Sequence, residues 1–181
     1  MNAAADRRRN ILACIGLVIG AVLGMLGTMV SSATVRDISW AIDSSALVMA
    51  TSLLALKFFR KGCDVVAAGF LVYAIGEAVM LSGTANSLEA SVPAFGAGVA
   101  LWSVALLLVS TPNVLATWVR LVGIVAAILF GITAIRIFAG TYLSPIASPL
   151  PYFGYPFLVL TFIGWIWTLL REKDSQDHPG L

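Results

Sequence analysis

The chain has 181 residues, of which 60% are hydrophobic and only 11% are charged, and its mean hydropathy is +0.97. Soluble domains average about 25% charged residues, so this composition excludes a soluble globular domain. The net charge of +2 is too small to indicate a nucleic-acid partner. We therefore expect an integral membrane protein whose main partner is the lipid bilayer.

Six apolar stretches account for nearly the whole sequence. Each is long enough to cross about 30 Å of hydrocarbon at about 1.5 Å per residue, and each must be helical because lipid offers the backbone no hydrogen-bond partners. The predicted fold is an all-α membrane protein, a compact bundle of six transmembrane helices in one domain over 1–170, followed by a polar tail over 171–181. The predicted spans are Ile11–Val30, Ile38–Phe59, Cys63–Ser82, Pro93–Ser110, Val114–Ala139 and Tyr152–Leu170.

The first stretch also has features of a cleavable signal peptide. It follows three arginines at 7–9 and precedes small residues at 31–33. Its length of about 20 residues exceeds the apolar core of a signal peptide and matches a membrane span. We expect a retained helix, and cleavage would leave the topology of the other helices unchanged.

The basic residues predict the orientation of the bundle. If the chain crosses six times, most of them fall on one side, which the positive-inside rule assigns to the cytoplasm. We therefore expect both termini and the tail to be cytoplasmic, in a multi-pass protein of the cell (inner) membrane. The residues on this side are Arg7, Arg8, Arg9, Lys57, Arg60, Lys61, Arg171 and Lys173.

Glycines recur at fixed spacing in the first and third spans. A spacing of four or seven residues places them on one helix face, where they allow a neighbouring backbone to approach closely. Two interpretations stay open: packing inside the bundle, or a face that binds a second copy or another membrane protein. The glycines concerned are Gly16, Gly20, Gly24, Gly69, Gly76 and Gly83.

Charged residues inside the spans are the main functional signal. Glu77 stands alone in an apolar run, where an ionised carboxylate costs about 2.5 kcal/mol or more. Counting from the predicted outer helix ends puts Asp43 about 9 Å, Glu77 about 13 Å and Arg136 about 6 Å deep. Arg36 precedes Asp43 by seven residues and shares its face. Asp43, Glu77 and Arg136 thus belong to the outer half of the membrane, and Arg36 is placed to reach down to Asp43.

These charges have two interpretations. The first is a substrate-, ion- or proton-binding site in an outward-facing cavity, with hydroxyl groups of neighbouring residues in its lining. The second is a structural network in which the acids pair with arginine. A further alternative is that Asp43 and Arg136 simply extend to the interface. The candidate residues are Asp43, Glu77, Arg136, Tyr73 and Ser44.

Common catalytic and cofactor motifs do not occur in the sequence. We find no GxxxxGK[ST], GxGxxG, HExxH or GxSxG pattern. No span contains a histidine, and the spacing of Cys14 and Cys63 is not that of metal ligands. We expect no metal, no cofactor and no catalytic residue. An enzymatic function would depend only on the two acids, and it is the least favoured class of function.

The favoured function is a small channel or transporter with an outward-facing polar site around Glu77. In this interpretation Glu77 accepts a proton or cation, and Arg136 is its counter-charge or an anion anchor. The alternative is a non-enzymatic membrane scaffold or subunit that packs against a partner, or as a homo-oligomer, through its glycine-lined helix faces.

Overall fold

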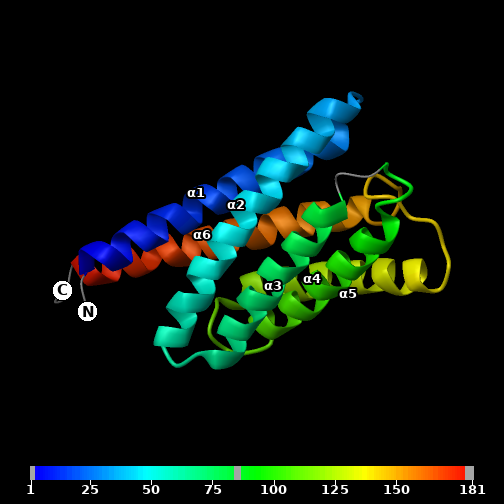
Figure 1. Cartoon of the computed structure of the whole chain (residues 1–181). Coiled ribbons are helices and arrows are strands. Elements are labelled where there is room, and N and C mark those ends of the chain that lie inside the picture. Colours follow the sequence, from blue (N-terminus) through cyan, green and yellow to red (C-terminus); the bar gives the residue numbers. More distant parts are fainter. Residues whose placement is uncertain (1–2, 84–86, 178–181) are drawn as a thin grey trace.

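A computed structural model describes the backbone of residues 3–83 and 87–177, with side chains over 6–83 and 87–171. All six predicted spans are helices, and the described residues contain no strand. The helices are α1 (Ala3–Met29), α2 (Ala33–Arg60), α3 (Asp64–Gly83), α4 (Val92–Ser110), α5 (Thr117–Phe138) and α6 (Tyr155–Asp177), with a short 3₁₀ helix, η1 (Tyr152–Gly154), before α6 (Figure 1). Each of the six is long and apolar enough to cross a membrane, which indicates a multi-pass membrane protein.

Five helix ends differ from the predicted bounds by three residues or more, and two of them are the starts of α5 and α6, which begin at Thr117 and Tyr155, three residues later than predicted. Both α1 and α2 begin before the apolar runs do, and the hydroxyl of Ser32 accepts a hydrogen bond from the backbone N–H of Val35 at the start of α2. The helix α6 continues to Asp177, so the polar tail is helical up to that residue. Charged or polar residues thus extend the helices beyond the apolar segments, which apolarity alone does not reveal.

The six helices form a ring. Each helix packs against its neighbours in the sequence, and α6 closes the ring against α1, beside which it runs in Figure 1. Aromatic side chains meet across the interior: the ring centroids of Phe70 and Trp165 lie 4.8 Å apart, and those of Tyr73 and Phe162 lie 5.9 Å apart. The core therefore occupies the middle of the ring.

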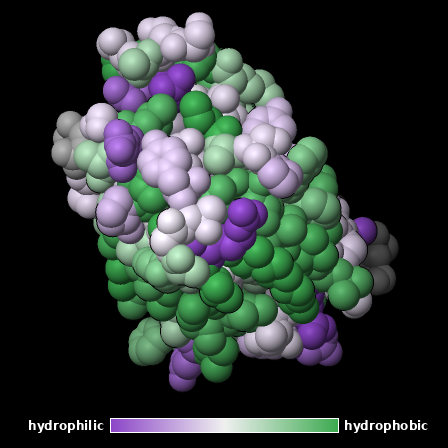
Figure 2. Space-filling model, turned by 90° about the vertical axis from the view of Figure 1, so that its right-hand side faces the viewer, coloured by the Kyte–Doolittle hydropathy of each residue, from purple (hydrophilic) through white to green (hydrophobic). Residues whose placement is uncertain are grey.

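The ring has two chemically distinct ends. We call the end where α1 begins and α6 ends the basic end; it also holds the α2–α3 and α4–α5 connections (Figure 1). The opposite end, the proline-loop end, carries the 139–154 connection with Pro145, Pro149 and Pro151. Figure 2 looks onto this end. Hydrophilic and intermediate residues (purple and pale) gather in the upper part and the centre of this view, and hydrophobic residues (green) lie beside them. That the basic end faces the cytoplasm stays a prediction.

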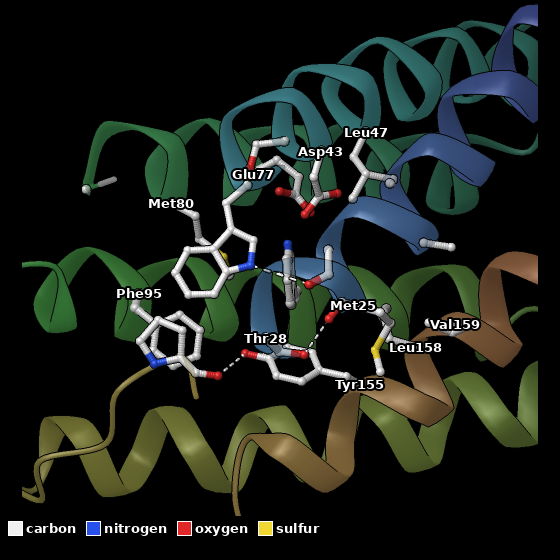
Figure 3. A pocket seen from close by; sticks show the side chains of 18 of the residues that line it. Met25, Thr28, Asp43, Leu47, Glu77, Met80, Phe95, Tyr155, Leu158 and Val159 are labelled. Carbon is white, nitrogen blue, oxygen red and sulfur yellow. Dashed lines mark hydrogen bonds between the residues drawn. The ribbon is translucent and has the colours of Figure 1, made fainter. Parts of the chain in front are cut away.

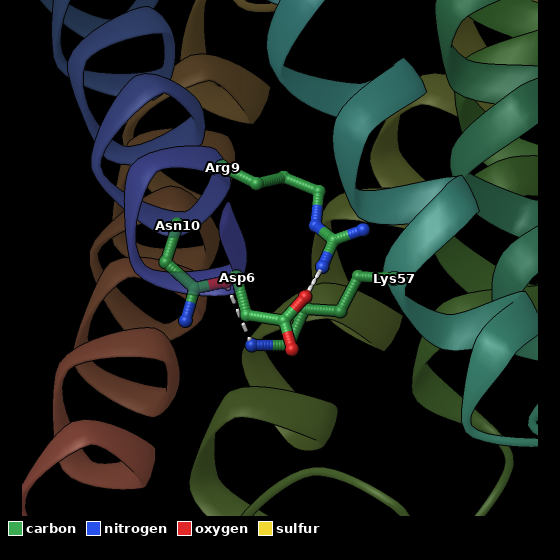
Figure 4. Close-up of polar contacts among 4 residues, drawn as sticks. All are labelled: Asp6, Arg9, Asn10 and Lys57. Carbon is green, nitrogen blue, oxygen red and sulfur yellow. Dashed lines mark hydrogen bonds and ion pairs between the residues drawn. The ribbon is translucent and has the colours of Figure 1, made fainter. Parts of the chain in front are cut away.

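Basic side chains at the basic end have polar partners. The Nζ of Lys57 donates a hydrogen bond to Oδ1 of Asn10 at 3.0 Å, and Arg9 pairs with Asp6 (Figure 4). Arg120 donates to the carbonyl oxygens of Ser110 and Thr111, both at 2.9 Å, and to Oδ1 of Asn113 at 2.7 Å. This guanidinium thereby satisfies carbonyl groups that the end of α4 leaves without intrahelical donors.

The regularly spaced glycines line two helix contacts inside the ring. A Cβ atom added at Gly16 would lie 2.7 Å from the carbonyl oxygen of Ala46 in α2. One added at Gly69 would lie 2.9 Å from Cβ of Leu108 in α4. The other members face the same two helices: Gly20 and Gly24 lie against α2, and Gly76 and Gly83 against α4. Both glycine faces are therefore occupied by helices of the same chain.

Candidate functional site

A cavity of about 100 Å³ lies in the half of the ring nearer the proline-loop end. Residues of α1, α2, α3, α4 and α6 line it, together with Leu88, Ser91 and Pro145 from the connections (Figure 3). Among the described residues, α5 contributes none to the lining. The cavity is larger than a single water requires, so it has room for a small ligand.

The carboxyl groups of Asp43 and Glu77 meet in this cavity. They come from α2 and α3 and lie beside each other in Figure 3. Glu77 is 1% exposed, and Asp43 is half-buried. Because α2 begins at Ala33 and α3 ends at Gly83, Asp43 lies about 15 Å and Glu77 about 9 Å from these helix ends. The sequence-based depths had the opposite order, because the count for Asp43 began inside α2 and the count for Glu77 began beyond the end of α3.

Three further polar side chains surround the Glu77 carboxyl: those of Ser44, Tyr73 and Trp102. The Tyr73 hydroxyl and the Trp102 indole N–H nevertheless lack hydrogen bonds of acceptable geometry, as do Oε1 of Glu77 and Oδ1 of Asp43. Buried polar atoms are nearly always bonded, so each exception calls for an explanation. Four exceptions around one cavity mark it as the candidate site.

Aromatic rings pack together on the basic-end side of the Glu77 carboxyl, in a cluster that we call the aromatic floor; of its members, Trp102 and Phe162 line the cavity. The rings of Tyr73 and Trp102 are stacked, with centroids 5.5 Å apart and planes 4° from parallel. Phe130 contacts Trp102 edge-on at 5.2 Å, and Phe162 contacts Tyr73. These contacts fix the rings in place. Because Tyr73 precedes Glu77 by one turn of α3, which begins at the basic end, the aromatic floor lies on the basic-end side of the Glu77 carboxyl.

Two aromatic side chains of the cavity wall form hydrogen bonds to backbone carbonyls. The Tyr155 hydroxyl donates to the carbonyl oxygen of Pro145 at 2.8 Å, which joins α6 to the proline-rich connection. The Trp40 indole donates a long bond of 3.4 Å to the carbonyl oxygen of Gly24. The wall thus couples α1 to α2, and α6 to the loop.

The arginines predicted to accompany the acids lie elsewhere. Arg136 is exposed on α5, because the buried face of that helix is formed by Thr133, Ala134 and Ile137. Arg36 is buried, but its guanidinium donates to the carbonyl oxygen of Val30 at 3.1 Å. Within the part of the chain that the structure describes, the one ion pair is Arg9–Asp6.

The structure therefore brings together four of the five sequence-derived candidates, Asp43, Glu77, Tyr73 and Ser44, and leaves Arg136 outside. Trp102 was missed as a polar participant. The sequence gives one signal for it: a tryptophan in the middle of a span has no interface to which its N–H can extend. Its N–H therefore needs a partner inside the bundle.

No protein-family model, no curated protein and no solved structure matches this chain.

Proposed function

We propose that this protein is a small membrane transporter that binds a cation or a proton at the Asp43–Glu77 pair and carries it across the membrane. One observation supports this most directly: two carboxyl groups meet in a cavity without a basic partner among the described residues. Both lie on helices that are long and apolar enough to span a membrane.

Electrostatics explains why such a pair attracts positive charge. One ionised carboxylate in hydrocarbon costs about 2.5 kcal/mol or more, and a second one nearby adds like-charge repulsion that low dielectric strengthens. A cation between the two groups, or a proton on one of them, relieves this repulsion. The pair is therefore suited to binding and releasing positive charge.

The position of the aromatic floor favours alternating access over an open channel. The cavity lies on one side of the Tyr73–Trp102 stack, toward the proline-loop end. Transport then requires the helices to move so that the carboxyl pair becomes accessible from the basic end, as in transporters whose sites lie near the middle of the membrane.

Electrophysiology on solid-supported membranes tests this proposal. Proteoliposomes are exposed to concentration jumps of protons, Na⁺, K⁺ or ammonium, and the transient current is recorded. We expect a current for at least one of these cations in the wild type and none in Glu77→Gln. Asp64→Asn is the matched control, because it neutralises an exposed carboxyl on the same helix outside the cavity lining; its current should equal that of the wild type.

Two results would overturn the proposal: no current from the wild type for any of these cations, or an equal current from Glu77→Gln. The scaffold alternative gains no support from the helix contacts. The glycine faces on which it depends are occupied by α2 and α4 of the same chain.

A further inference from the structure

We infer that the ligand of the Asp43–Glu77 pair is a small primary alkylammonium ion. This inference rests on the proposed function, because it concerns the same site and names the class of substrate. Three features of the cavity carry it: the apolar character of its lining, the unbonded acceptor atoms of the two carboxyl groups, and its size.

The cavity lining suits an ion with an apolar body. A third acid, Asp37, and the hydroxyl residues Thr28, Ser44 and Ser91 also line the cavity. The rest of the wall consists mostly of apolar and aromatic side chains, among them Leu47, Met80, Phe95 and Phe162. A bare Ca²⁺ or Mg²⁺ ion takes about six to eight oxygen ligands, and no group of three or more His, Cys, Asp or Glu side chains comes together in the described residues. An alkyl chain, by contrast, gains from burial against such a wall.

The acceptor atoms match an ammonium head with N–H groups. Oδ1 of Asp43 and Oε1 of Glu77 both lack hydrogen bonds, and a primary ammonium has three donors. Two of these donors satisfy the two carboxyl groups at once, in charge-assisted bonds. A quaternary ammonium has no N–H and would leave both acceptors unbonded, so the geometry favours the primary amine.

The size of the cavity sets an upper limit for the ligand. Its volume is about 100 Å³, whereas an apolar cavity of about 150 Å³ is known to hold benzene. Chains of one to three carbons therefore fit beside the carboxyl groups. A hexyl chain does not fit unless the helices separate.

Isothermal titration calorimetry in nanodiscs of zwitterionic lipid tests the inference with propylammonium chloride. We expect saturable binding, with tetramethylammonium, sodium and neutral 1-propanol each weaker by about tenfold or more, as the loss of one charge-assisted hydrogen bond implies. Asp43→Asn and Glu77→Gln should each weaken propylammonium binding by a similar factor. Asp64→Asn should bind like the wild type, and the thermal midpoint of each variant confirms that it is folded.

The inference is overturned if propylammonium shows no saturable heat, if sodium binds as tightly, or if both folded cavity variants bind like the wild type. Its failure is distinguishable from that of the proposed function. Propylammonium binding without a transport current for any cation, propylammonium included, would retain the ligand class and reject transport. A proton or sodium current without propylammonium binding would retain transport and reject the ligand class.

Discussion

The basic end and the cavity hold their charged groups in opposite ways. At the basic end, Arg120 has three hydrogen-bond acceptors and Lys57 has Asn10. In the cavity, Asp43 and Glu77 lie beside each other without a basic partner among the described residues, and each retains an unbonded oxygen. Polar groups that support a fold are normally bonded, whereas groups that serve a ligand are retained at a cost to stability. The difference separates structural charges from functional ones.

The largest effect is expected from Arg120→Gln. The substitution removes charge-assisted hydrogen bonds to two carbonyl oxygens at the end of α4, so the free energy of unfolding should fall by about 3 kcal/mol. Denaturant titration in mixed micelles measures it. The matched control is Arg136→Gln on the same helix, whose side chain is exposed and whose loss should change stability by less than about 0.5 kcal/mol.

An equal loss of stability in both arginine variants would weaken the comparison between the basic end and the cavity. It would mean that Arg136 also supports the bundle, as the sequence-based counter-charge interpretation requires. A loss confined to Arg120→Gln would place the structural role at the basic end.

A smaller effect is expected from Gly24→Ala, which acts on the cavity. The added methyl would lie 2.9 Å from Oδ2 of Asp43, so the carboxyl must shift away from its present position. Propylammonium binding and transport current should fall by about tenfold, the equivalent of about 1.4 kcal/mol. The free energy of unfolding should change little, because the preference of a helix for alanine over glycine, about 1 kcal/mol, offsets the cost of displacing the carboxyl.

The control for this variant is Gly131→Ala. Its added methyl would lie at the same distance, 2.9 Å, from a side-chain oxygen, that of Ser103, which does not line the cavity. Binding and current should match the wild type. If both alanine variants lose activity equally, the effect comes from helix packing in general and not from the position of the Asp43 carboxyl.

Much of the fold follows from the sequence, because an apolar run of about 20 residues in lipid has one stable conformation. All six helices were predicted, and seven of their twelve ends lie within one residue of the prediction. The ends at Ala3, Ala33 and Asp177 were missed because polar and charged residues continue the helices. A hydrophobicity argument does not register such extensions.

The site was predictable in part. Glu77 stands out in the sequence because a carboxyl in an apolar helix is costly, and Asp43 shares its half of the bundle. That the two acids meet while Arg136 faces outward depends on the rotation of each helix, which the nearly uniform apolarity of α5 does not reveal. Trp102 requires the same tertiary information.

The most direct test compares the free energy of unfolding of the wild type with that of Glu77→Gln in lipid nanodiscs or mixed micelles. Because no basic side chain of the described residues pairs with Glu77, removing its charge should leave stability unchanged or raise it. A decrease of about 3–5 kcal/mol, the cost of breaking a buried ion pair, would contradict this account. It would show that Glu77 holds the bundle together instead of serving a ligand.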